Sequence, residues 1–293
     1  MDVFEGKSWI SGKGLNHVCV GVEDGKISSV KKILKGDTHT NFHGVLLPGA
    51  FDMHVHFRDP GYPHKEDWKS GSESAAAGGV TAVVDMPNTN PFTSDLETFR
   101  AKESTAASKS VVDFGLGVNV DQDLTKQTWF DTIPAAFWKL YPYGISSDDF
   151  FSYANEVLDK TKKPLVIHCE HPDHMHNNPL NQLSDHTQNR LIAEPECLAS
   201  MPSSSYLHVA HLSTFEGLNR VPKLATSEVC PHHLLLNLDN CKSIDIKFNE
   251  LTKKYPKLEA NIIGINRADK FFIPKKNDTV KQEDKIYVLI NSS

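Results

Sequence analysis

The sequence contains no apolar run long enough to cross a bilayer and no N-terminal stretch with the composition of a secretory signal. It also lacks an excess of positive charge, because 31 Lys and Arg residues stand against 37 Asp and Glu residues, for a formal net charge of -6. A nucleic acid or another polyanion is therefore not an expected partner. These absences predict a cytoplasmic protein that binds neither membranes nor nucleic acids.

Cysteine is scarce, with five residues and no Cys-x-x-Cys pair. An odd and scattered set indicates reduced thiols rather than a disulfide framework or a structural zinc knot. Histidine is frequent by comparison, with 15 residues. That number suggests metal binding but does not locate it.

One histidine pair stands in a segment that reads as a strand. His54 and His56 alternate with apolar residues, follow the apolar run 45–50 and precede Arg58 and a Pro-Gly pair. Because the side-chain period of a β-strand is two, both imidazoles point to the same side. Two such imidazoles at a strand end can bind one divalent metal ion. The alternative is a pair of packed or surface histidines, but the residues that follow favour a metal site.

Strand-like and helix-like segments alternate from residue 45 onward. The predicted strands are 45–53, 80–86, 111–119, 135–141, 164–169, 206–212 and 226–236, and the predicted helices are 68–78, 94–108, 122–131, 148–161, 186–200 and 215–223. This alternation predicts βαβ units and a parallel sheet. Seven strands with polar C-terminal ends predict an α/β fold of the (β/α)₈-barrel type that is one strand short. A doubly wound sheet is the alternative, but no Gly-x-Gly-x-x-Gly follows any strand.

Three motifs resemble those of dihydroorotases, in the amidohydrolase superfamily. They are Asp52-Met-His-Val-His-Phe-Arg-Asp-Pro-Gly61, Asp85-Met-Pro-Asn-Thr-Asn-Pro91 and Glu228-Val-Cys-Pro-His-His-Leu234. The resemblance covers roughly residues 1–240. It implies a β-sandwich portion at 1–44, where Glu23-Asp24-Gly25 reads as a hairpin turn, and an incomplete amidohydrolase barrel at 45–240. The implied reaction is reversible hydrolysis of L-dihydroorotate to N-carbamoyl-L-aspartate, a step of pyrimidine synthesis.

The resemblance also implies a binuclear site, with Zn²⁺ as the expected metal. In that arrangement His54 and His56 bind the first ion, His168 and His211 bind the second, and Lys139, carboxylated on Nζ, bridges them. A hydroxide between the two ions would be the nucleophile. From the residues alone, Lys139 in an aromatic strand is also compatible with a lysine that reaches out to solvent at a strand end.

Arg58 and Asn88 are the predicted substrate-binding residues. Arg58 lies two residues beyond His56, and its planar guanidinium group suits a carboxylate. Asn88 follows the second predicted strand and can add an amide contact. In dihydroorotases these two positions hold the substrate carboxylate. Arg58 and the Pro-Asn-Thr run at 87–89 favour that family over allantoinases and hydantoinases.

One family motif is missing. Dihydroorotases end the eighth strand with an aspartate in Asp-His-Ala-Pro-His, and this sequence contains no such motif. Asp269 is a candidate replacement, although a surface turn residue is the alternative. Loss of a general base lowers a rate by about a hundred- to ten-thousandfold. Two alternatives to an active enzyme therefore follow: a catalytically dead partner of a pyrimidine-pathway enzyme, or an accidental fusion of two coding regions. A homo-oligomer is a further expectation.

The tail, residues 241–293, differs in composition and is rich in Lys and Asp. Its pattern predicts a small α+β segment with a helix at 249–254 and a strand at 285–290. It resembles the TrkA-C (RCK-C) module of potassium-transport regulators. The alternative is that its strands complete the β-sandwich begun by residues 1–44.

Overall fold

The computed structural model describes residues 1–120, 132–175, 183–230 and 233–234, and three strands within 260–290. For residues 183–188 and for those three strands it describes the backbone alone. The chain forms two compact units, Met1–Lys139 and Leu140–Ser293, and each is described by itself. The helices predicted at 122–131 and 249–254, and the candidate base Asp269, lie outside the described residues.

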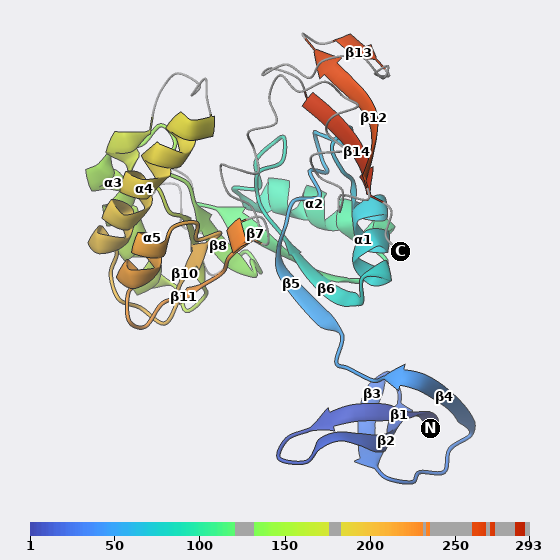
Figure 1. The fold of residues 1–293 in the computed structure, drawn as a ribbon. Coiled ribbons are helices and arrows are strands. Elements are labelled where there is room, and N and C mark those ends of the chain that lie inside the picture. The colour runs from blue at the N-terminus through green and yellow to red at the C-terminus, as the bar shows by residue number, and fades with distance from the viewer. Residues whose placement is uncertain are drawn as a thin grey trace. The chain divides into compact units, whose positions relative to one another are not determined.

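The first unit begins with a four-stranded mixed sheet in the order β3-β2-β1-β4 (Figure 1). Its strands are β1 (Asp2–Ile10), β2 (Gly14–Glu23), β3 (Lys26–Lys31) and β4 (Thr38–Val45). The pairs β1/β2 and β2/β3 are antiparallel, and β1/β4 is parallel. Asp24 and Gly25 both have positive φ, 49° and 73°, as a tight hairpin turn requires, so the predicted turn is confirmed.

Parallel strands follow in the chain, with helices between the first three of them in sequence (Figure 1). The strands are β5 (Ala50–Val55), β6 (Val80–Asp85), β7 (Asp113–Asn119) and β8 (Phe137–Leu140), whose last residue starts the second unit; the helices are α1 (Trp68–Ala77) and α2 (Leu96–Lys109). Neighbouring strands pair in parallel. Asp67 and Asp95 cap the two helices by accepting hydrogen bonds from backbone amides of the first turn.

Trp68, at the start of α1, fixes the loop that follows β5. Its fully buried indole packs on Phe57 and Phe114, with ring centroids 5.0 and 5.4 Å away. The indole Nε1 donates to the Asp59 carbonyl oxygen at 3.0 Å. The loop beyond the two histidines is therefore held by a large apolar contact and a buried hydrogen bond.

The second unit repeats the strand–helix alternation. Its elements are α3 (Ser147–Lys160), β9 (Leu165–His168), η2 (Pro172–His174), α4 (Leu183–Ser200), β10 (Leu207–Ala210), α5 (Phe215–Arg220) and β11 (Thr226–Ser227). β10 pairs in parallel with β9 and with β11. Strands β9 and β10 are almost wholly apolar and buried, as expected for parallel strands covered on both faces.

The strand order β11-β10-β9-β8-β7-β6-β5 confirms the predicted α/β class with seven strands. The last strand is shorter than predicted, because β11 covers only residues 226–227 and residues 233–234 are helical. Within the described part of the chain, β5 and β11 are the end strands of this order.

The tail contributes a separate antiparallel sheet in the order β13-β12-β14. Its strands are β12 (Ala260–Arg267), β13 (Lys270–Phe272) and β14 (Lys285–Ile290), so the predicted strand at 285–290 is confirmed. Among the strands that the structure describes, these three pair only with one another. An eighth barrel strand from the tail is therefore not seen in the described residues. No helix of the described chain is long and apolar enough to span a membrane.

Candidate active site

The first histidine pair lies at the C-terminal end of β5. His54 Nε2 and His56 Nε2 are 3.2 Å apart, and the two ring centroids are 5.1 Å apart. The period-two prediction that both rings face the same side is confirmed. Two nitrogens bound to one tetrahedral zinc ion are about 3.3 Å apart, so this pair has the spacing that a single ion requires.

Asn88, in the loop after β6, holds the second of these rings. His56 Nδ1 and Asn88 Oδ1 are 2.8 Å apart. A ligand histidine is typically fixed in this way, by a hydrogen bond at the nitrogen that does not bind the metal. Burial lowers the pKa of His56 to about 4, and the charges of His54, Arg58 and Lys139 act in the same direction against the contact with Asn88. His56 is thus neutral near pH 7, the form that binds metal.

The other predicted residues of the first unit lie around this pair. Arg58 adopts a positive φ of 61° and donates from Nη1 to the Asn88 carbonyl oxygen at 3.3 Å. Lys139 is 1% exposed, on β8 in register with Asn119 of β7. A buried ammonium is costly, and carboxylation would replace the cation with a carboxylate that can bind metal. The modification itself stays a prediction.

We expect Asn88→Ala to weaken zinc binding by about 10- to 100-fold, because the ring of His56 loses the group that orients it. Competition between the metal-free chain and a chelator measures the affinity. Asn90→Ala is the matched control, since Asn90 is exposed on the same loop. Equal affinities for the two variants would contradict the role of Asn88.

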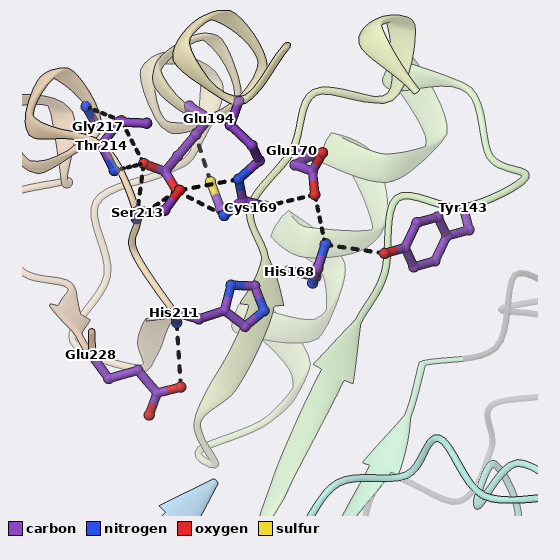
Figure 2. Close-up of polar contacts among 11 residues, drawn as sticks. Tyr143, His168, Cys169, Glu170, Glu194, His211, Ser213, Thr214, Gly217 and Glu228 are labelled. Carbon is purple, nitrogen blue, oxygen red and sulfur yellow. Dashed lines mark hydrogen bonds and ion pairs between the residues drawn. The ribbon is translucent and has the colours of Figure 1, made fainter. Parts of the chain in front are cut away.

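The second histidine pair belongs to the second unit. His168 ends β9, His211 follows β10, and their rings meet edge to face with centroids 4.5 Å apart (Figure 2). His168 Nε2 lies 3.1 Å from the Tyr143 hydroxyl and 2.8 Å from Glu170 Oε1. A metal bound through that nitrogen would replace these contacts. In the second pair, a metal ion would therefore have to displace existing contacts of the His168 ring before it could bind through Nε2.

His168 contacts one end of a buried ionic network through Glu170 (Figure 2). Glu170 Oε1 accepts from Arg190 Nη1 at 2.6 Å, and Arg190 Nη2 donates to Glu194 Oε2 at 3.0 Å. Glu194 also accepts from the backbone amides and hydroxyls of Ser213 and Thr214 at 2.6–2.9 Å. The network ties β9 and α4 to the segment that follows His211.

Glu170 is held ionised by this network. Burial alone would raise its pKa, but the hydrogen bond with His168 and the charge of Arg190 outweigh burial and lower the pKa to about 2. Sequence reasoning missed the network. One local signal was available, since Arg190 and Glu194 are four residues apart, the spacing of neighbours on a helix face.

The predicted site residues thus fall into two groups. His54, His56, Arg58, Asn88 and Lys139 belong to the first unit, and His168 and His211 belong to the second. His208, within β10, is buried, and its Nδ1 lies 2.8 Å from Thr226 Oγ1.

Comparison with known proteins decides the family. The family model described as "Amidohydrolase family" matches residues 45–246. The chain belongs to the amidohydrolase family. Among curated proteins, this amidohydrolase is 32% identical over 301 residues to a dihydroorotase of Methanosphaera stadtmanae, covering 90% of this chain and 67% of the relative. It is 34% identical over 282 residues to a dihydroorotase of Methanothermobacter thermautotrophicus, covering 86% and 64%.

Solved structures of the same fold include an L-hydantoinase of Arthrobacter aurescens, with a TM-score of 0.64 and 21% identity over 82% of this amidohydrolase and 61% of that chain. A D-hydantoinase of Bacillus sp. AR9 gives a TM-score of 0.66 and 18% identity, covering 85% and 61%. These likenesses confirm the predicted amidohydrolase fold. The resemblance of residues 241–293 to a TrkA-C module receives no support, and the family match ends at residue 246.

The amidohydrolase spans only part of these proteins, 67% and 64% of the two dihydroorotases named above. The activity and the substrate of the whole relatives therefore enter below as proposals.

Proposed function

We propose that this amidohydrolase is a metal-dependent cyclic amidohydrolase of the dihydroorotase type, which opens the ring of L-dihydroorotate reversibly to N-carbamoyl-L-aspartate. The observation that carries the proposal is the 3.2 Å spacing of His54 Nε2 and His56 Nε2 at a strand end, with Asn88 on the far nitrogen of His56. The dihydroorotase relatives support the substrate class.

Two Zn²⁺ ions are the proposed cofactors. His54 and His56 would hold one ion, His168 and His211 the other, and carboxylated Lys139 would bridge them. Ions bound there would activate water and polarise the scissile carbonyl. The five proposed ligands belong to the described part of the chain, while the proposed stand-in base, Asp269, lies outside it.

Arg58 is the proposed determinant of the substrate. Its side chain is half-buried beside Asn88, on the loop that directly follows the two histidines. A guanidinium group placed there would pair with the carboxylate that distinguishes dihydroorotate from dihydrouracil. Asn88 would bind the same carboxylate through its amide nitrogen, since its Oδ1 is engaged by His56.

Turnover tests the proposal. The zinc-loaded chain is expected to open L-dihydroorotate, and Arg58→Gln is expected to lower kcat/KM by about 10- to 100-fold, the value of a hydrogen bond to a charged group. Dihydrouracil, which has no carboxylate, is the matched control, and any turnover of it should be insensitive to Arg58→Gln. An equal loss for both compounds would contradict carboxylate recognition by Arg58.

A non-catalytic partner of a pyrimidine-pathway enzyme is the second candidate. The observation that favours it is the strand order of the described residues, in which the tail strands pair only with one another. The same assay separates the candidates, because about two zinc ions per chain without turnover of dihydroorotate would support the partner. No metal and no turnover would defeat the enzyme.

A further inference from the structure

The N-terminal sheet carries a second group of metal-binding side chains, far along the sequence from the histidines of the barrel strands. Glu5 on β1 is the cross-strand partner of Cys19 on β2 and of Asn41 on β4. His17 and His39 lie two residues before those two partners. Because side chains alternate along a strand, Glu5, Cys19, His17 and His39 share one face of the sheet.

The side chains on this face converge. Glu5 Oε1 is 2.8 Å from His17 Nε2, and Glu5 Oε2 is 3.1 Å from His39 Nε2. One ligand atom each from Glu5, Cys19 and His39 lies within 4.8 Å of the others. In a tetrahedral zinc site a sulfur and a nitrogen ligand are about 3.6 Å apart. A contraction of about 1 Å, within reach of side-chain rotation, therefore suffices to enclose an ion.

We propose that Glu5, Cys19 and His39 bind one zinc ion on the N-terminal sheet, independently of the amidohydrolase site. A thiolate, an imidazole and a carboxylate together select zinc over the hard cations Mg²⁺ and Ca²⁺, which take oxygen ligands. The half-exposed His39 leaves the site open to an ion from solvent. His17 contacts the other carboxylate oxygen of Glu5. A residue that does not bind the metal itself can orient a ligand carboxylate through such a hydrogen bond.

The group differs from ordinary cross-strand pairs because of its cysteine. Exposed ion pairs between a glutamate and two histidines contribute little to stability and need no thiol beside them. Cys19 is buried, and its Sγ donates to the Lys32 carbonyl oxygen at 3.4 Å. Zinc would take the thiol as a thiolate and release its proton to solvent.

Cobalt substitution tests the proposal on the full chain. Titration of the metal-free protein with Co²⁺ alone is expected to give a thiolate-to-cobalt charge-transfer absorption in the near ultraviolet, with an amplitude at saturation that corresponds to one thiolate-bound ion per chain. Cys19→Ser should abolish this absorption, and Cys230→Ser, at a half-buried thiol of the second unit, should leave it unchanged. The double variant His54→Ala/His56→Ala should also keep it, whether or not the chain turns over dihydroorotate.

Two further variants guard against a folding artefact at the buried Cys19. His39→Gln, at a half-exposed position, and His17→Ala should preserve the circular dichroism spectrum and the unfolding midpoint of the parent. His17→Ala should weaken Co²⁺ binding by about 10- to 100-fold, and His39→Gln by at least as much. The absence of a charge-transfer absorption in the parent chain, or its persistence in Cys19→Ser or in folded His39→Gln, would overturn the proposal.

Discussion

Glu194→Ala is expected to lower the free energy of unfolding of the second unit by about 3–5 kcal/mol, the loss typical of breaking a buried ion pair. The carboxylate of Glu194 is fully buried and accepts from Arg190, Ser213 and Thr214. Alanine would leave the Arg190 guanidinium short of one partner and would leave two backbone amides without their acceptor. Buried donors without acceptors are expensive.

The neighbouring Glu196 provides the control for this prediction. It lies on the same helix, is exposed, and pairs with His174 at 2.6 Å. Exposed pairs contribute about 0.2–1 kcal/mol, so Glu196→Ala should change stability little. Urea unfolding compares the variants, and hydrogen exchange in residues 207–220 reports the local effect. Equal losses for the two variants would show that the buried network contributes no more than a surface pair.

Lys102→Met is expected to cost a similar amount, about 3–5 kcal/mol, in the first unit. Lys102 Nζ lies 2.5 Å from Asp85 Oδ2, both side chains are fully buried, and Nζ also donates to the Met86 carbonyl oxygen at 2.8 Å. Burial raises the pKa of Asp85 and lowers that of Lys102, while each charge opposes the shift of the other. Methionine fills the space of the lysine but leaves the Asp85 carboxylate without its cation.

The Asp85–Lys102 pair also supports the first histidine pair, because Asp85 Oδ1 accepts from the backbone amide of Phe57 at 2.7 Å. We therefore expect Lys102→Met to weaken zinc binding at His54 and His56 in addition to its effect on unfolding. The double variant Asp85→Leu/Lys102→Met should be less destabilised than the sum of its single variants, since neither charge is then left buried alone. Additive losses in urea unfolding would contradict a direct coupling.

Local sequence patterns determined the elements of this protein. The alternation of β-branched strands with helices predicted β6 to β10 and α1 to α5 to within a few residues, because apolar, β-branched runs and the helix-like segments between them can be recognised in a short window. The Asp24-Gly25 turn and the facing rings of His54 and His56 follow from equally local rules. The family motifs added the identities of the remaining predicted ligands.

Only the tertiary structure decided which distant groups meet. It placed Asn88 on His56, 32 residues away, and joined Glu170, Arg190 and Glu194 to the segment after His211. It also set the strand register that brings Glu5, Cys19 and His39 together from three strands, and it limited β11 to two residues. Periodicity fixes the face on which a side chain lies, but strand register and helix packing are cooperative results of the whole core, so contacts between faces cannot be deduced from any one segment.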